Sequence, residues 1–247
     1  MEAQKIKPYK AVSEIYSYLM RFINYSDWAE YYFLLSKGYV NKKAKVLELA
    51  GGNCQLSTYL KSYYRNIIVT DLSDEMLKQS KVKNIDRVCC NMEALPFRNE
   101  FDLVISAFDS VNYLLTKKSI NNLFSGVYNI LSSGGIFSFD VSLESNSLKN
   151  LKYLNRSGYY NGINYFQKSE YDKEKRIHTN KFKIITSEGD TFVEVHRQRI
   201  FPVEIYFELL VDNGFVIKEC YEAFSFNDAG PDSERVQFIA AKEKKDA

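Results

Sequence analysis

The sequence predicts an α/β protein built on a mostly parallel sheet, and three observations support this fold class. Residues 45–49 form a short apolar run that ends in a glycine turn and is followed by a helical pattern. Residues 66–71 form a second, β-branched run that ends in an acid. From about Tyr159 the pattern changes to alternation in twos, which predicts antiparallel strands late in the chain.

The first predicted strand, Lys45–Leu49, leads into the turn Ala50-Gly51-Gly52-Asn53-Cys54. A helical pattern follows, with side chains at the i, i+3, i+4, i+7 positions Leu56, Tyr59, Leu60 and Tyr63. Glycine lets the backbone approach a ligand closely, and a helix N-terminus offers free N–H groups to an anion or carboxylate. The stretch predicts a nucleotide-binding unit, although turns in proteins that bind no nucleotide also contain glycines.

The second predicted strand, Asn66–Asp71, places an acid 23 residues after Glu48. An acid at the tip of the second strand is suited to accept hydrogen bonds from ribose hydroxyls. The alternative is that Asp71 only begins a turn. Ser73 follows as a plausible N-cap of the next helix, with two acids in the first turn.

The two motifs E-L-x-G-G-x-x and V-x-D-x-S-x-x-M-L, at residues 48–54 and 69–77, resemble those of class I S-adenosylmethionine-dependent methyltransferases. The resemblance covers most of the chain. It is greatest to the small-molecule branch with a late antiparallel insertion, such as sugar-amine and glycine N-methyltransferases. It implies a Rossmann-like sheet of seven mostly parallel strands in the order 3-2-1-4-5-7-6, with S-adenosyl-L-methionine as cofactor and S-adenosyl-L-homocysteine as product.

The glycine turn departs from the family pattern at two positions. Where the family usually has G-x-G-x-G, Ala50 replaces the first glycine and Cys54 the last. The last glycine allows close approach of helix and strand. We therefore expect the side chain of Cys54 to shift the helix slightly and to change cofactor affinity with it.

The resemblance also implies which residues contact the cofactor. The glycine turn would hold its amino-acid end, Asp71 its ribose and Asn91 its adenine, where the family commonly has Asp. The alternative for Asn91 is an Asn-initiated turn. The full set of expected contacts is Tyr9, Tyr16, Glu48, Ala50, Gly51, Gly52, Asn53, Asp71, Leu72, Met76, Asn91, Met92, Ala107 and Phe108.

The fourth predicted strand, Phe101–Ala107, delivers Phe108–Tyr113 to the carboxyl edge of the sheet, where ligands bind in open α/β sheets. The segment F-D-S-x-N-Y-L resembles the motif that follows this strand in the small-molecule branch. Tyr113 is a poor base at its ordinary pKa near 10, but it can orient an amine or hydroxyl. The alternative is a capped turn with a buried tyrosine.

Three alternating runs predict an antiparallel meander over Ile163–Gln167, Arg176–Ile184 and Thr191–Arg199, which can cover the carboxyl edge. The pattern E-x-H-x-x-R resembles the last strand of the insertion in the branch, although a lone histidine on a strand more often packs than reacts. The expected catalytic residues are Tyr113 and His196, and the expected acceptor contacts are Trp28, Asp109, Asn112 and Arg199.

Residues 8–37 contain aromatic stripes at helical spacing, and they resemble the N-terminal lid of the branch, so that Tyr9 and Tyr16 either pack or line the site. A later helix around residues 120–131 is expected to stop at Gly134-Gly135. The predicted organisation is a helical lid at 1–40, a cofactor-binding domain at 41–145 and 200–247, and an inserted meander at 146–199.

Composition limits the partners of the chain. The 33 Lys and Arg residues nearly balance the 31 acids, which argues against a strongly electrostatic nucleic-acid binder. No apolar run approaches the length of a membrane span, and the first residues lack a signal-peptide core. The four cysteines have neither metal nor redox spacing. We expect a cytoplasmic monomer or homodimer without a metal, a nucleic-acid partner or a membrane partner.

The predicted function is transfer of a methyl group from S-adenosyl-L-methionine to an N or O atom of a small molecule. A strong general base is dispensable if the acceptor is an amine that arrives neutral. Two alternatives stay open: the same fold acting on RNA or protein, and a catalytically silent cofactor-binding or partner-binding module.

Overall fold

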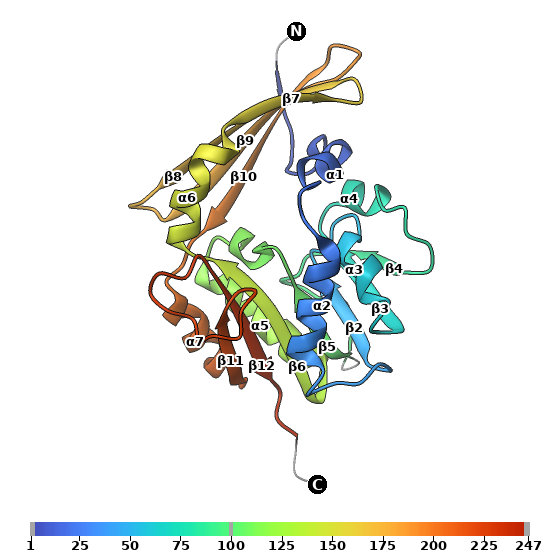
Figure 1. Cartoon of the computed structure of the whole chain (residues 1–247), viewed down its shortest axis with the longest axis vertical. Coiled ribbons are helices and arrows are strands. Elements are labelled where there is room, and N and C mark those ends of the chain that lie inside the picture. The colour runs from blue at the N-terminus through green and yellow to red at the C-terminus, as the bar shows by residue number, and fades with distance from the viewer. Residues whose placement is uncertain (1–2, 99–100, 245–247) are drawn as a thin grey trace.

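Two sheets organise the chain in this computed structural model, which describes residues 3–98 and 101–244. A seven-stranded sheet forms the lower half of the molecule in Figure 1, and a five-stranded sheet lies above it. The N-terminal segment runs beside the upper sheet, whereas the last described residues leave the lower one at the opposite end.

The seven-stranded sheet has the predicted strand order. From one edge to the other it runs β4-β3-β2-β5-β6-β12-β11, which is 3-2-1-4-5-7-6 in chain order within this sheet. Only β12 pairs antiparallel, on both of its sides. The strands are β2 (Lys45–Leu49), β3 (Asn66–Asp71), β4 (Asp86–Cys89), β5 (Phe101–Ser106), β6 (Leu131–Ser142), β11 (Val216–Glu222) and β12 (Arg235–Ala241). The predicted fold class is confirmed.

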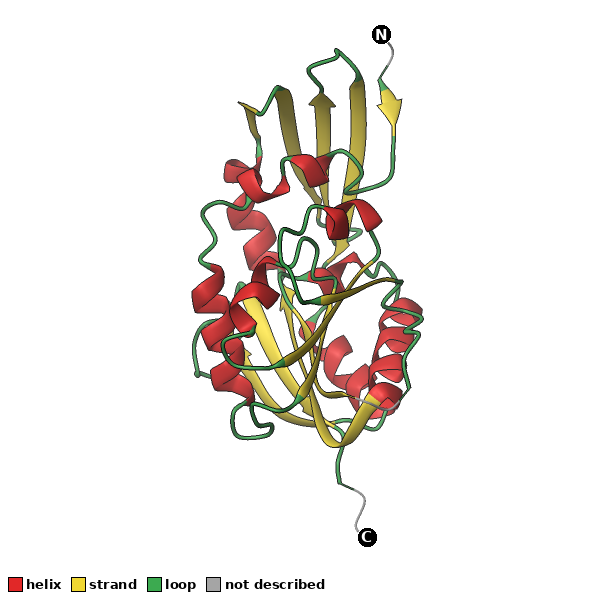
Figure 2. Ribbon diagram, turned by 90° about the vertical axis from the view of Figure 1, so that its right-hand side faces the viewer, coloured by secondary structure: helices red, strands yellow, loops and turns green. Residues whose placement is uncertain are grey.

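Helices cover both faces of this sheet, as Figure 2 shows. Side chains of α2 (Tyr25–Ser36) and α3 (Gln55–Leu60) pack in one core, and those of α5 (Lys117–Ile130) and α7 (Val203–Asp212) in the other. Successive residues of β2 serve opposite cores, because Val46 belongs to the first and Leu47 to the second. Burial on both faces explains the nearly continuous apolar run of this strand.

The five-stranded sheet is larger than the predicted meander. Its order is β1-β10-β9-β8-β7, and α6 (Glu144–Leu154) leads into it. The strands are β1 (Gln4–Lys5), β7 (Arg156–Tyr160), β8 (Ile163–Asp172), β9 (Ile177–Ile185) and β10 (Thr191–Arg199). The sequence did not predict β7 or β1. The two residues of β1 pair in parallel with β10, almost 190 residues away, and such a contact leaves no local pattern.

The N-terminal segment is less helical than predicted. Among the described residues before α2, the helical segments are the 3₁₀ turn η1 (Val12–Glu14) and the four-residue α1 (Tyr16–Leu19), and Tyr9 lies in a turn with φ +62°. The buried apolar residues of this segment pack on apolar side chains of β8 and β9 in the five-stranded sheet, and not on the seven-stranded sheet. This cluster comprises Ala11, Val12, Ile15, Leu19, Ile163, Tyr165, Phe182 and Ile184.

The predicted stop of α5 at Gly134-Gly135 is wrong. The helix ends at Ile130, and β6 begins directly at Leu131, so that both glycines lie inside the strand. A Cβ on Gly135 would meet three backbone carbonyl oxygens at 3.0–3.2 Å, two of them in β5. Gly135 therefore permits close approach of β5 and β6. The division of the chain into three domains stays a prediction.

Candidate active site

A cavity of about 1430 Å³ lies between the two sheets. Its floor consists of the loops at the carboxyl ends of β2, β3, β4 and β5, at residues 50–55, 71–76, 90–93 and 107–113. Its roof consists of seven side chains from β7–β10, namely Arg156, Gln167, His178, Asn180, Phe182, His196 and Gln198. Ligand pockets usually measure about 300–1,000 Å³, so this cavity has room for a cofactor and a second molecule.

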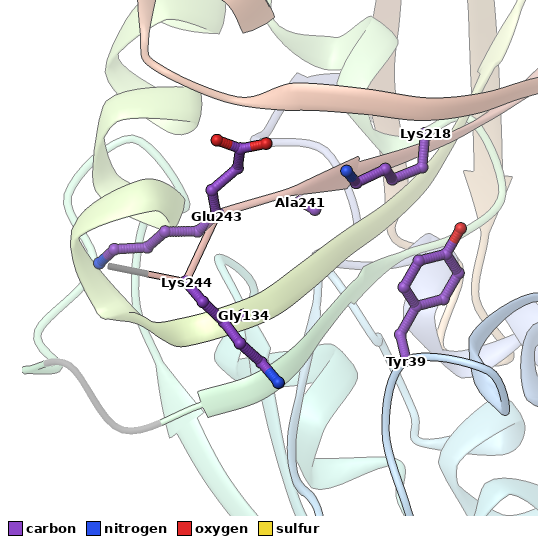
Figure 3. Close-up of a pocket in the computed structure, with 7 residues that line it drawn as sticks. Tyr39, Gly134, Lys218, Ala241, Glu243 and Lys244 are labelled. Atoms are coloured by element: carbon purple, nitrogen blue, oxygen red, sulfur yellow. The ribbon is translucent and has the colours of Figure 1, made fainter. Parts of the chain in front are cut away.

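All fourteen predicted cofactor contacts line this cavity, together with Tyr113, His196, Trp28 and Asp109. Asn112 and Arg199 do not. A second hollow of about 420 Å³, shown in Figure 3, lies among Tyr39, Lys218, Glu243, Lys244 and their neighbours and contains none of the predicted site residues. The structure thus brings most of the predicted residues together in one cavity.

The glycine turn keeps a left-handed backbone at three alternate positions. Ala50, Gly52 and Cys54 have φ of +50°, +55° and +64°. Ala50 and Cys54 occupy two positions where the family usually has glycine. A left-handed conformation costs a residue with a Cβ about 1–2 kcal/mol. Cys54 is fully buried directly before α3 and packs in the core beneath that helix. The chain therefore retains the turn in spite of both substitutions.

Asp71 is held by the backbone on both of its oxygens. Its Oδ2 accepts the N–H of Gly52 and its Oδ1 the N–H of Ser73, both at 2.8 Å. Burial raises the pKa of this carboxyl above its ordinary value. A carboxylate oxygen can accept about two hydrogen bonds, so each oxygen of Asp71 can accept one more, from a ribose hydroxyl. Ser73 also caps α4 (Asp74–Lys78) by accepting the N–H of Met76, as predicted.

Glu48 is a buried acid beneath the glycine turn. Its side chain is almost inaccessible, its Oε2 accepts the hydroxyl of Ser57, and burial raises its pKa to about 8. A buried carboxyl with a raised pKa is stabilised in its charged form by a nearby cation. Its position therefore suits the ammonium group at the amino-acid end of the cofactor.

Apolar and aromatic side chains also line the cofactor end. Asn91 lies there in the Asn-initiated turn given as the alternative, because its Oδ1 accepts the N–H of Glu93 at 3.0 Å. Its NH₂ group stays available to a ring nitrogen of adenine. The rings of Trp28 and Phe108 lie with centroids 4.0 Å apart and planes tilted by 34°, and aromatic faces attract a cationic sulfonium. Acids, apolar side chains and aromatic rings together fit S-adenosylmethionine.

Four side chains form a hydrogen-bonded row from the N-terminal segment to β10. The hydroxyls of Tyr9 and Tyr113 lie 2.6 Å apart, and that of Tyr113 lies 3.5 Å from Nδ1 of His196. Nε2 of His196 lies 2.9 Å from Oε2 of Glu194, which is fully buried. Because a carboxylate accepts, Nε2 donates to Glu194, and Nδ1 of a neutral ring would face the hydroxyl of Tyr113 with its lone pair.

Glu194 also holds the N-terminal turn. Its Oε1 accepts the N–H groups of Ala11 at 2.5 Å and Val12 at 3.0 Å, and its Oε2 accepts that of Tyr9 at 2.7 Å. Glu194 is part of the pattern E-x-H-x-x-R, but the sequence analysis assigned it no role. One signal could have found it, because Glu194 precedes His196 by two positions on a strand and so shares its face.

Asp109 lines the cavity but is not free. Arg235, which the sequence analysis also missed, forms ion pairs with Asp109 and Asp140, and Nε2 of Gln198 donates to Oδ2 of Asp109 at 2.5 Å. The burial of Arg235 is offset by these two acids, which raise its pKa. This predicted acceptor contact is therefore already engaged in an ion pair and a hydrogen bond within the protein.

Asn112 and Arg199 are placed differently from the prediction. Asn112 is fully buried, and its amide donates to the carbonyls of Ser142 and Arg199 and accepts the N–H of Ser142. Every one of these bonds joins backbone segments, so the side chain is a structural connector. The guanidinium of Arg199 lies over the ring of Phe201, 5.2 Å from its centroid, outside the cavity lining.

Fold and cavity define a class of protein. A mostly parallel sheet with a glycine turn after its first strand and an acid after its second binds a nucleotide-containing cofactor at the carboxyl edge. Comparison with known proteins narrows this class. A methyltransferase domain model matches residues 46–135. A Bacillus subtilis protein, YqeM, named only as a methyltransferase, is 31% identical over 96% of this chain and 98% of its own.

Solved structures agree in fold over nearly the whole chain. A methyltransferase of Clostridium acetobutylicum, described as S-adenosylmethionine-dependent, superposes with a TM-score of 0.77 at 22% identity, covering 95% of this chain and 99% of that one. A sugar N-methyltransferase of Streptoalloteichus superposes with a TM-score of 0.73 at 15% identity, covering 92% and 91%. The chain belongs to the class I S-adenosylmethionine-dependent methyltransferases, and its cofactor is S-adenosylmethionine. In the described residues, no helix is long and apolar enough to cross a membrane.

Proposed function

We propose that this methyltransferase acts on an N or O atom of a small molecule held between the floor and the roof of the cavity. The observation that supports this most is the roof itself. Seven side chains of β7–β10 line the cavity across from the strand ends. A polymer would need an open groove at that edge, whereas a roofed cavity favours a compact acceptor.

The sugar N-methyltransferase among the structural neighbours agrees with this proposal, because the same fold there accommodates a small acceptor. The charge of the chain agrees as well. Its formal net charge is only +2, which gives little general attraction for RNA.

When bound, the cofactor supplies an electrophilic methyl group on a sulfonium sulfur. The chain contributes position, alignment and exclusion of water, and these effects alone account for large rate increases. In this proposal Asp71 binds the ribose hydroxyls of the cofactor, and Glu48 binds the ammonium group at its amino-acid end. Tyr113 orients the N–H or O–H of the acceptor, and Nδ1 of His196 accepts the released proton.

Calorimetry with S-adenosylmethionine and S-adenosylhomocysteine tests the first half of the proposal, and saturable binding of both is expected. A screen of small amines, phenols and hydroxy acids for S-adenosylhomocysteine formation tests the second half. Cofactor binding without turnover of any small molecule, together with methylation of RNA or protein, would contradict the proposed acceptor class. Failure to bind the cofactor would contradict the function as a whole.

A further inference from the structure

The two ends of the cavity differ in charge. The cofactor end contains the four carboxyl groups of Glu48, Asp71, Glu75 and Glu93. The roof contains none, because its seven side chains are one arginine, two histidines, three amides and one phenylalanine. A cationic cofactor suits the first end, so the roof is the place to look for the charge of the acceptor.

Arg156 is the one permanent cation of the roof, and it is not paired with an acid. The structure records no ion pair for it in residues 3–98 and 101–244, and its Nε donates to Oε1 of Gln167 at 2.8 Å. Arg235 provides a contrast, since two aspartates pair with it in the same cavity. Burial lowers the pKa of Arg156, as expected for a half-buried guanidinium without a counterion.

The hydrogen bonds beside Arg156 fix the direction of two amides. An arginine Nε can only donate, so Gln167 must turn its oxygen toward Arg156 and its NH₂ toward Asn180. Nε2 of Gln167 indeed lies 3.0 Å from Oδ1 of Asn180. The NH₂ group of Asn180 then has no partner in the described residues, and it lines the cavity as a donor.

This row of donors ends beside the catalytic candidates. Asn180 lies directly opposite His196 in the pairing of β9 with β10, and Arg156 lies opposite Gln167 in that of β7 with β8. A molecule bound to both Arg156 and Asn180 would therefore extend along the roof toward His196 and Tyr113. The two terminal nitrogens of an arginine match the oxygens of a carboxylate or phosphate.

We propose that the methyl acceptor is an anion, a small molecule with a carboxylate or phosphate group that Arg156 and the NH₂ group of Asn180 bind. The inference rests on the proposed function, because it names the class of acceptor for the same cavity. It assigns Arg156 as the residue that selects an anionic acceptor over a neutral or cationic one.

The test uses the full chain saturated with S-adenosylhomocysteine, which fills the cofactor end. Citrate and sodium pyrophosphate are titrated by calorimetry at constant ionic strength set with sodium chloride, and they distinguish a carboxylate from a phosphate preference. We expect saturable binding of at least one, weakened at least tenfold by Arg156→Gln. The matched control is Arg197→Gln, on the exposed outer side of β10, which should leave binding unchanged.

Two results would overturn the inference: no saturable binding of either anion, or equal weakening by Arg156→Gln and Arg197→Gln. If Arg156→Gln fails to fold, Arg156→Lys keeps the charge but loses the two-pronged contact, and it should weaken binding severalfold. Unchanged binding in that variant would also overturn the inference. Binding of S-adenosylhomocysteine is measured first, so that its failure, which contradicts the proposed function, is distinguished from failure of the anion alone.

Discussion

The floor and the roof of the cavity are built in different ways. The floor consists of short continuous segments, each directly after one strand of the parallel sheet. The roof consists of single side chains from four strands, which meet only through the pairing of those strands. A continuous segment leaves a motif in the sequence, whereas a set assembled by strand pairing leaves none. Four variants test whether the two halves also differ in what they contribute.

The largest effect is expected at the joint between the roof and the N-terminal segment. Glu194→Ala removes the acceptor of three backbone N–H groups and of His196, and the unfolding free energy should fall by about 3 kcal/mol. Urea denaturation measures the change. Glu174→Ala, at an exposed position in the loop after β8, should change stability by less than about 0.5 kcal/mol. Equal losses in the two variants would contradict a special role for Glu194.

At the floor, the expected effect is on ligand affinity. Asp71→Ala should weaken binding of S-adenosylmethionine at least about tenfold, equivalent to about 1.4 kcal/mol. The ribose would lose its hydrogen-bond acceptor, and the N–H groups of Gly52 and Ser73 would lose theirs. Calorimetry gives the affinity. Asp74→Ala, three residues on and paired with Lys78 outside the cavity, is the control. Unchanged affinity in the Asp71 variant would remove this residue from the site.

Glu48 should make stability depend on pH. Its pKa of about 8 in the folded chain exceeds its ordinary value, so the folded state retains a proton that the unfolded chain releases. Stability is therefore greatest below the ordinary pKa and declines as pH rises through 8. Between pH 7 and 8 the cofactor-free protein should lose about 1 kcal/mol relative to Glu48→Gln, as measured by urea denaturation. If the unfolding free energies of the two proteins changed with pH in parallel, the raised pKa of Glu48 would be contradicted.

Tyr113→Phe should have the smallest effect. It removes a hydroxyl from the row between the floor and the roof, and turnover should fall about threefold to fivefold, about 1 kcal/mol, with cofactor affinity unchanged. Initial rates with an acceptor from the screen measure this. Tyr206→Phe removes a buried hydroxyl that has no hydrogen-bond partner among the described residues and lies outside the cavity, and it should leave turnover unchanged. Turnover that survives Tyr113→Phe intact would make this tyrosine a packing residue.

The sequence was sufficient for the fold and for the floor. Apolar runs, glycines and the acid at Asp71 predicted the first parallel strands and the loops that line the cavity, because each of these signals is local, whereas the strand order was implied by the resemblance to the methyltransferase family. The same reasoning failed at two acceptor candidates. Arg199 lies on the same strand as His196 but three positions on, which is the opposite face, and its guanidinium contacts Phe201. Asn112 lies in a predicted acceptor motif but bonds to the backbone of the distant residues Ser142 and Arg199.

The roof residues Arg156 and Gln167 show why the rest could not be predicted. They lie eleven positions apart on separate strands, and only the register of β7 with β8 makes them neighbours. Glu194 reaches the backbone of Ala11 across more than 180 positions. Neither spacing belongs to a helix or a single strand, so no periodicity in the sequence indicates the contact.

Glu194 has a consequence for the order of events in turnover. It fastens the turn at Tyr9–Val12 to β10, and β1 adds to the edge of the same strand. The N-terminal segment reaches the glycine turn as well, where Nδ2 of Asn53 donates to the hydroxyl of Ser17. Displacing the N-terminal segment would therefore expose the cofactor end and the acceptor end of the cavity at the same time. We therefore expect the two products to leave in random order, each competing for the same open form of the enzyme in product-inhibition experiments.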